Sequence, residues 1–247
     1  MTLATDLERD IVLATGRLTL YSLLAAGLMF PTETRMGTMR STLLPAVSQL
    51  DLGADLDPVV ESLAGSLPGS VDAMRVFYME LFPPIASQDA PGYETGYRGE
   101  GVFQQSAILA DIAGFYRAHG LRAGGSERER LDHISVEMEF MAVVAKKEVL
   151  ALQAGNEENV AICRETAAGF LGEHLGCWAR SFGLRASAVS SSGWYTALGE
   201  LLTMWVETDL TILGVEPVEV ADHPLPQEPP DDDSCGPCPT PGTGGGK

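Results

Sequence analysis

The chain has 247 residues, of which 45% are hydrophobic, and it carries 16 Lys and Arg against 34 Asp and Glu, a formal net charge of −18. This length suggests one or two domains, and the apolar content suffices for a packed core, which excludes an entirely disordered chain. Because nucleic acids are bound through clustered Lys and Arg, the charge disfavours them as direct partners and is compatible with a basic peptide or protein.

The N-terminal segment indicates the compartment. Asp6 and Glu8 stand where a secretory signal would have a basic start. The apolar run over 18–30 is interrupted by Tyr21 and Ser22 and is shorter than the roughly 20 residues of a membrane-spanning helix. The sequence therefore predicts a cytoplasmic protein with no membrane span, whose cysteines are free thiols or metal ligands rather than disulfides.

Apolar residues recur at helical spacing along most of the chain. The predicted helices cover 5–29, 70–82, 104–119, 132–153, a stretch from Asn156 to Phe182, and 192–213. Residues 36–66 are ambiguous because Pro45 and Pro58 interrupt the pattern. Sustained alternation of apolar and polar residues is essentially absent, so no strand is predicted. The predicted fold class is all-α, a single bundle-like domain of roughly eight helices.

Helix ends and domain limits follow from individual residues. Asp132 and Asn156 are predicted N-caps, and Gly120 occupies a typical helix C-terminal position, just after His119. There is no proline between Gly92 and Glu216, but there are eight from Pro217 to Pro241. The sequence thus predicts a helical body over 1–216 and a flexible tail rich in Pro, Gly and Asp over 217–247.

The tail contains the pair Cys235-Gly-Pro-Cys238, the spacing of a redox dithiol. Three aspartates precede the pair and prolines follow it, so neither the helix nor the lowered thiol pKa that such chemistry needs is expected. Two cysteines supply only half of a closed zinc site, although His223 or a second chain could complete it. A reduced tail is favoured, and a metal or redox carrier using these cysteines is kept as an alternative function.

No catalytic motif emerges from the remaining residues. The chain has no phosphate-binding loop and no dinucleotide fingerprint. Asp132-His133 has no recognisable nucleophile, Glu137 and Glu139 point in different directions on a helix, and His174 lies on an apolar stripe typical of a core histidine. The sequence therefore predicts neither an enzyme nor a cofactor of its own.

One aromatic stretch exceeds what a connection between helices needs. A helix ending in Tyr78-Met-Glu-Leu81-Phe82 meets Pro83-Pro84, and a loop then leads to the segment 91–97, which contains two further tyrosines. Aromatic side chains on a loop beside a helix end are typical of a peptide-binding surface. On physical grounds alone, the alternative that these rings only close the core is equally good.

Several segments, in the order in which they occur along the chain, resemble those of the TorD/DmsD/NarJ family of redox-enzyme maturation chaperones. They are Arg17, Tyr21, Leu24 and Phe30-Pro31 in the first helix; Tyr78-x-x-Leu81-Phe82; Pro91-Gly-Tyr93-Glu94-Thr95-Gly-Tyr97; Phe115-Tyr116 to Gly120-Leu121; Asp132-His133 to Glu137-Met-Glu139-Phe140-Met141; and Phe170-Leu-x-x-His174-Leu-x-x-Trp178. Together they span about 1–210. The chain departs from the family pattern at Gly92, Gly96 and Leu131, which predicts a looser loop and hinge.

The resemblance implies an all-α, cofactor-free cytoplasmic chaperone, either a monomer or a domain-swapped dimer. Such a chaperone binds the apo catalytic subunit of a molybdoenzyme of the dimethyl-sulfoxide-reductase type, or its twin-arginine leader peptide, until the cofactor is inserted. The family's binding surface maps onto these residues: Tyr78, Leu81, Phe82, Pro91, Tyr93, Glu94, Asp132 and His133.

A leader with a basic start and an apolar middle suggests how this surface binds. We expect Glu94, Asp132 and Glu137 to face the leader's arginines. The rings of Tyr78, Phe82, Tyr93 and Tyr97 are expected to take its apolar part. His133 is the candidate for a group that titrates near neutral pH and modulates release.

Overall fold

The computed structural model describes residues 5–50, 55–83, 89–99, 101–122 and 129–218, and all regular structure in these ranges is helical. The elements are α1 (Asp6–Leu28), α2 (Glu33–Thr38), the π-helical turn η1 (Met39–Leu43), α3 (Leu44–Val47), α4 (Asp57–Ser66), α5 (Val71–Leu81), α6 (Thr95–Arg98), α7 (Val102–Ala118), α8 (Ile134–Gln153), α9 (Glu157–Phe170), the π-helical turn η2 (Leu171–Leu175), α10 (Gly176–Val189) and α11 (Gly193–Leu213). The predicted all-α fold is confirmed.

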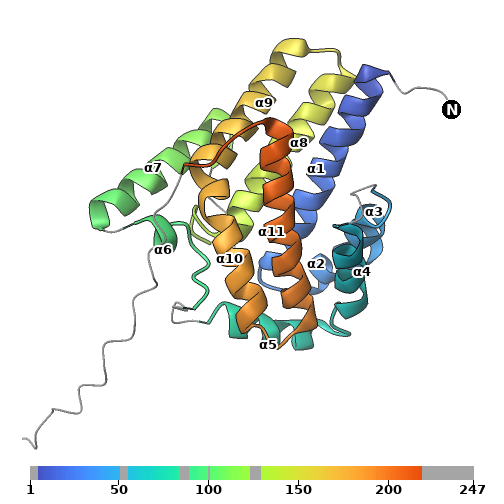
Figure 1. Cartoon of the computed structure of the whole chain (residues 1–247), viewed down its shortest axis with the longest axis vertical. Coiled ribbons are helices and arrows are strands. Elements are labelled where there is room, and N and C mark those ends of the chain that lie inside the picture. The colour runs from blue at the N-terminus through green and yellow to red at the C-terminus, as the bar shows by residue number, and fades with distance from the viewer. Residues whose placement is uncertain (1–4, 51–54, 84–88, 100, 123–128, 219–247) are drawn as a thin grey trace, which may run out of the picture.

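Helices α1, α8, α9 and α11 form the body of the molecule, and α10 continues the course of α9 through η2 without a break. Helices α2, α3 and α4 lie on one flank, α6 and α7 lie on the other, and α5 lies across one end (Figure 1). Helix α1 packs on α8, α8 on α9, and α10 on α11. Phe82, which follows α5, lies beside Phe182 of α10 and beside His133, which precedes α8, so these three elements come together there.

The ambiguous region contains helices, and its two prolines lie in different positions. Pro58 lies in the first turn of α4, where a proline is tolerated because the missing N–H would have no intrahelical acceptor. Pro45 lies near the start of α3, which follows the π-helical turn η1 without a break, so this proline lies inside the helical course from Glu33 to Val47. Pro58 therefore marks where a helix begins, and Pro45 lies where a π-helical turn changes to an α-helix.

Most predicted helix ends agree with the structure, and one is wrong. Asn156 caps α9 by accepting a hydrogen bond from Asn159 N, and Gly120, with φ 74°, follows the end of α7. The N-cap of α8 is His133 instead of Asp132, and its side chain accepts from Ser135 N. Asp132 is not available as a cap because its carboxylate binds other partners, described below.

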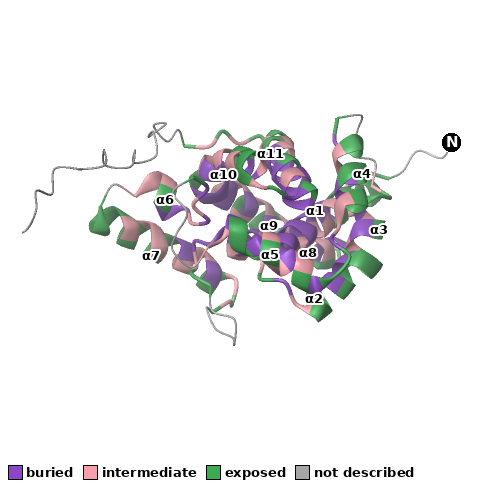
Figure 2. Ribbon diagram, turned by 90° about the horizontal axis from the view of Figure 1, so that it is seen from below, coloured by how far each residue is buried: buried purple, intermediate pink, exposed green. Residues whose placement is uncertain are grey.

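The core is continuous and rich in aromatic side chains. Buried residues gather on the faces that the central helices turn toward one another, while exposed residues cover their outer faces (Figure 2). The largest fully buried side chains are Trp178, Trp194, Tyr21, Tyr195, Phe140, Phe170 and Phe182. Burial of this size gives the bundle most of its stability, since a fully buried large apolar side chain contributes about 1.5–3 kcal/mol.

An ion cluster lies inside this core between α1, α8 and α11. Arg17 Nε donates to Asp209 Oδ1 at 2.7 Å, and Arg17 Nη1 donates to Glu148 Oε2 at 2.9 Å. Tyr21 Oη donates to Asp209 Oδ2 at 2.6 Å, and Arg164 Nε donates to the other oxygen of Glu148 at 2.7 Å. Without the guanidinium of Arg17, Asp209 would be buried without a counter-charge, whereas Glu148 would keep its pair with Arg164.

Helix α1 has 23 residues and, by length and composition alone, is apolar enough to cross a membrane, contrary to the length argument from the sequence. Half of its most apolar stretch is buried inside the fold, and Arg17 makes its ion pairs there. These are the properties of a core helix packed among other helices.

The chain after α11 folds back onto η2. Gly214, with φ 65°, ends α11, and Val218 N donates to Gly172 O at 2.9 Å. A Cβ on Gly172 would lie 2.8 Å from Val215 Cγ1, so the glycine allows this close approach. The predicted tail lies outside the described residues apart from Pro217 and Val218, and Cys235 and Cys238 lie outside them as well.

Candidate functional site

The residues predicted to bind a partner come together at the junction of α5, the 89–94 segment, α6 and the start of α8. The Phe82 ring lies 4.8 Å from the Tyr78 ring and 5.1 Å from the His133 ring, between centroids. Tyr93 lies 5.2 Å from His133, and the backbones of these two residues form an isolated β-bridge. Residues far apart in the sequence thus form one cluster.

Most of this cluster is buried. Glu94, Asp132 and Glu137 have 0% exposure, and Tyr78, Leu81 and His133 have at most 4%. Phe82, Pro91, Tyr93 and Tyr97 are half-buried, so their edges form the surface of the cluster. In this conformation an approaching partner meets rings and a proline, and the three carboxylates lie beneath them.

Asp132 holds the loop to the start of α8. Its Oδ2 accepts hydrogen bonds from Thr95 Oγ1 at 2.7 Å, Thr95 N at 3.2 Å and Arg130 Nη2 at 2.9 Å. Its backbone carbonyl accepts from Glu94 N at 2.9 Å, and Gly92 O accepts from Ile134 N at 2.9 Å. The loop is therefore fastened by one carboxylate and two backbone bonds.

Glu94 lies at the centre of a second set of polar contacts. Its carboxylate accepts from Arg98 on α6 and lies 3.1 Å from His174 Nδ1 on η2. His174 Nε2 lies 3.3 Å from Asp111 Oδ2 on α7. His174 is buried as predicted, but its contact with Glu94 was missed. The spacing of Arg98, four residues after Glu94 on a short helix, was a signal for the ion pair.

Glu137 is a buried carboxyl group that has no positively charged partner among the described residues. Trp178 Nε1 donates to its Oε2 at 3.1 Å, and none of the described residues forms a hydrogen bond with its Oε1. Burial, and then the nearby carboxylate of Glu94, raise the pKa of Glu137 well above its ordinary value. Glu137 therefore holds its proton under conditions in which an exposed glutamate has released it.

His133 is held neutral. Burial, and then the charge of Arg130, lower the pKa of His133 to about 4. Its Nδ1 lies 2.8 Å from Ser135 Oγ. The hypothesis that this histidine titrates near neutral pH is wrong for this conformation, because a desolvated imidazole beside a guanidinium does not accept a proton there.

The two glycines of the loop have packing roles. A Cβ on Gly92 would lie 2.7 Å from Phe82 Cε1 and 3.2 Å from His133 Nε2. A Cβ on Gly96 would lie 2.9 Å from Pro91 Cβ. These close contacts disagree with the prediction that Gly92 and Gly96 make the loop looser. Glycine here lets the loop approach the rings more closely than any other residue would.

We expect Glu137→Gln to stabilise the protein increasingly as pH rises. With a raised pKa, the folded state keeps a proton that the unfolded chain releases above about pH 4.5, so this group lowers stability as pH increases. Glutamine still accepts from Trp178 but does not titrate. The measurement is Tm between about pH 5 and 8. The control is Glu139→Gln, which is exposed on the same helix and whose Tm difference should stay flat. A pH-independent difference for Glu137→Gln would contradict the prediction.

The acidic side chains of the cluster lie inside it, and cations lie at its edge. Its acidic groups are paired or protonated, and among the described ranges no group of three or more His, Cys, Asp or Glu side chains could hold a metal ion. Cys163 is buried and free, and burial raises its thiol pKa. Arg130 lies over the Tyr93 ring at 4.6 Å and Arg185 over the Tyr97 ring at 5.9 Å, so cations border the exposed rings.

Several assembly chaperones are similar in sequence. The chlorate reductase assembly chaperone protein of Ideonella dechloratans is 31% identical over 46% of this chain and 56% of its own length. The selenate reductase assembly chaperone protein of Thauera selenatis is 30% identical over 44% of this chain and 55% of its own length. The chain thus spans about half the length of these two relatives. The chaperone protein TorD of Vibrio cholerae is 21% identical over 69% of this chain and 77% of its own. These relatives are chaperones and not enzymes.

A crystal structure from Archaeoglobus fulgidus, whose protein is assigned to redox enzyme maturation by inference, is similar in fold. It aligns over 78% of this chain and 93% of its own chain, with a TM-score of 0.46 and 20% sequence identity. The all-α fold is given by the helices described above and does not depend on this likeness. The family model for the nitrate reductase delta subunit matches residues 50–183, which is more than half of the chain and includes the whole cluster described here. The chain belongs to the nitrate reductase delta subunit family.

Proposed function

We propose that the protein is a cytoplasmic chaperone that binds the apo catalytic subunit of a molybdoenzyme of the dimethyl-sulfoxide-reductase type, or its twin-arginine leader, before export or assembly. Family membership and the similarity to reductase assembly chaperones support this function. The observation that carries it is the group of half-buried rings at Phe82, Tyr93 and Tyr97 above a buried set of carboxylates.

The rings and the carboxylates have different parts in this proposal. The exposed edges of Phe82, Pro91, Tyr93 and Tyr97 receive the apolar part of the client and remove it from water. Glu94 and Asp132 are already paired with Arg98 and Arg130. A client arginine therefore binds by replacing one of these two guanidinium groups, which requires the 89–97 loop to lift from α8. Docking on the rings precedes this exchange.

Replacing Phe82 by alanine is expected to weaken client binding about tenfold, since a well-packed aromatic anchor commonly accounts for more than 1 kcal/mol of binding energy. The client is first obtained by purifying the tagged protein from its own cells and identifying the bound subunit. Affinity for the synthetic leader of that subunit is then titrated by fluorescence anisotropy, and it should fall as salt rises.

The matched control is Phe103→Ala, because Phe103 is 94% exposed on α7 and, among the described residues, takes no part in the ring contacts of the cluster. Its affinity should equal that of the unaltered protein. Recovery of no reductase subunit, or turnover of a substrate by the isolated chain, would reject the proposed function. Equal affinity in the Phe82→Ala and Asp132→Ala variants would reject this site.

A further inference from the structure

Two arginines border the exposed rings of the cluster, and a basic leader does not account for them. Arg130 lies over the Tyr93 ring and Arg185 over the Tyr97 ring. Among the described residues, none accepts a hydrogen bond from Arg130 Nη1 or Arg185 Nε, and none forms an ion pair with Arg185. Such donors attract carboxylates and repel the basic part of a client. The edge of the cluster is therefore complementary to an acidic segment.

The end of the described chain lies beside this cluster. Val218 lines a groove next to α7 together with Arg98 and His174. Arg98 directly follows Tyr97, and the ring of His174 contacts the carboxylate of Glu94, so both groove residues adjoin the candidate site. The chain that continues from Val218 therefore starts at the edge of that site.

The sequence after Val218 has the chemistry that this edge complements. Residues 224–233 read Pro-Leu-Pro-Gln-Glu-Pro-Pro-Asp-Asp-Asp, with four prolines and four carboxylates. Proline-rich segments bind surfaces lined by aromatic rings, because an extended proline-rich chain loses little entropy on binding. At about 3.3 Å per residue, the chain from Val218 reaches up to about 20 Å at Pro224 and about 50 Å at Asp233. The segment has the length to pass along the groove and to lie over the rings.

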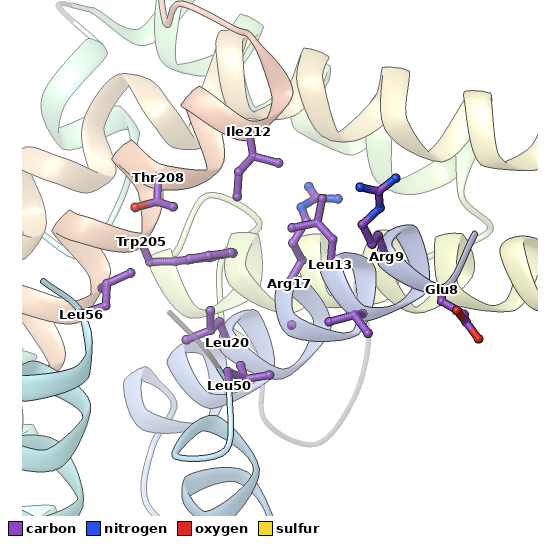
Figure 3. A pocket seen from close by; sticks show the side chains of 12 residues that line it. Glu8, Arg9, Leu13, Arg17, Leu20, Leu50, Leu56, Trp205, Thr208 and Ile212 are labelled. Atoms are coloured by element: carbon purple, nitrogen blue, oxygen red, sulfur yellow. The ribbon is translucent and has the colours of Figure 1, made fainter. Parts of the chain in front are cut away.

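Another apolar surface is less suited to this segment. The pocket between α1 and α11 has a volume of about 500 Å³, and Leu13 and Ile212 face it (Figure 3). Its two arginines, Arg9 and Arg17, are paired with carboxylates of the described chain. Val218 does not line this pocket. An acidic segment that starts at Val218 is therefore matched by the ring cluster and not by the pocket.

We propose that residues 224–233 of this chain lie over the ring cluster when no client is bound, and that the client displaces them. The prolines cover the exposed edges of Phe82, Tyr93 and Tyr97, and the acidic run pairs with Arg130 and Arg185. The free protein then does not present these rings to unrelated proteins. The inference rests on the proposed function, because it describes the regulation of the same site.

The contact is weak in itself and effective because it is intramolecular. Asp111 and Glu173 line the groove and oppose the acidic run, so we expect an intrinsic dissociation constant of only about 0.2 mM. A short flexible connection gives an effective concentration of about 1 mM. The site is then uncovered in about one-sixth of the molecules, and a leader binds about sixfold more weakly than to an open site.

A photo-crosslink measures the contact without any client. In the full chain p-benzoylphenylalanine replaces Gln227, and crosslinked peptides are identified by mass spectrometry. We expect crosslinks within one chain to the segments 89–98 and 129–133. Their yield should fall about threefold or more when salt is raised from about 50 mM to about 500 mM, because exposed ion pairs are screened. A mixture of isotopically light and heavy protein distinguishes contacts within one chain from contacts between two.

Two pairs of substitutions test the charges. The acidic run is neutralised by combining Asp231→Asn, Asp232→Asn and Asp233→Asn. Its control removes the same charge from exposed positions of α9 by combining Glu157→Gln, Glu158→Gln and Glu165→Gln. Arg185→Gln is compared with Arg180→Gln on the same helix, where Arg180 pairs with Glu207. We expect the crosslink yield to fall about threefold in the aspartate variant and about twofold in Arg185→Gln, and to stay unchanged in both controls.

Leader affinity gives a second readout. The aspartate variant should bind the leader of the co-purified subunit about sixfold more tightly than the unaltered chain does. The glutamate control should bind it with the affinity of the unaltered chain. An excess of leader should suppress the crosslink in the unaltered chain, because client and segment compete for the same rings.

Crosslinks to other parts of the fold, crosslinks between chains, or an unchanged yield in the aspartate variant would overturn the inference. So would weaker leader binding by that variant, because the acidic run would then attract the client instead of excluding it. Each of these results leaves the proposed function standing, since that function is tested by the identity of the co-purified subunit and by Phe82→Ala. Recovery of no reductase subunit would reject the function and would not alter the crosslink.

Discussion

Replacement of Arg17 by methionine is expected to lower the free energy of unfolding by about 3–5 kcal/mol, the range for removal of one partner from a buried ion pair. Arg17 has 2% exposure and donates to both Asp209 and Glu148. Its loss leaves Asp209, which has 0% exposure, with only the hydroxyl of Tyr21 as a donor among the contacts described. The measurement is urea denaturation followed by circular dichroism.

Arg9→Met is the control for Arg17→Met. Arg9 lies on the same helix and pairs with Asp6, but both side chains are largely exposed, so the change should be within about 0.5 kcal/mol. The combination Arg17→Met with Asp209→Leu should recover part of the loss, because a buried charge without a partner is then removed. A loss of less than about 1 kcal/mol for Arg17→Met would show that the cluster is not needed to neutralise the core.

Replacement of Asp132 by alanine is expected to lower the free energy of unfolding by about 2–3 kcal/mol. The buried hydroxyl and amide of Thr95 lose their acceptor, whereas the half-exposed side chain of Arg130 regains water and adds little. The loop that contains Glu94 thereby loses the hydrogen bonds between Thr95 and the Asp132 carboxylate, which hold it to the start of α8. Amide hydrogen exchange at Glu94 and Thr95 should therefore accelerate more than exchange in α10 or α11.

Binding gives a second readout for Asp132→Ala. If a client arginine exchanges with Arg130 at this carboxylate, the variant should bind the leader about tenfold more weakly although its loop opens more easily. The control is Asp72→Ala, since the Asp72 side chain is 86% exposed and pairs with Arg75 on the surface of α5. Faster exchange with unchanged leader affinity would contradict the proposed role of Asp132 in binding.

Local features of the chain could be predicted because they depend on neighbours in sequence. The apolar spacing over 5–29 corresponds to α1 at Asp6–Leu28, and the spacing over 192–213 corresponds to α11 at Gly193–Leu213. The cap at Asn156 needs only the amide of Asn159, three residues away. Asp132 was predicted to cap in the same way, but Thr95, 37 residues earlier, takes its carboxylate. That competition is visible only in three dimensions.

The site was predicted only as a set of residues. The family resemblance assigned Phe82, Tyr93 and His133 to one surface. In the structure the His133 ring lies next to the rings of both Phe82 and Tyr93. The exposed fraction of each of these side chains could not be predicted, because it depends on how α5, α8 and α10 pack around them. The low pKa of His133 and the high pKa of Glu137 have the same origin, since both result mainly from desolvation. The spacing of residues along the chain does not show which side chains lose their contact with water.

The bond from Val218 N to Gly172 O connects the end of the described chain to the interior of the site. Gly172 lies two residues before His174, whose ring contacts Glu94. Val218 and His174 also line the same groove beside α7. A fluorophore attached at position 218 would therefore act as an external reporter, and its emission should change when a guest polypeptide displaces Glu94 from His174.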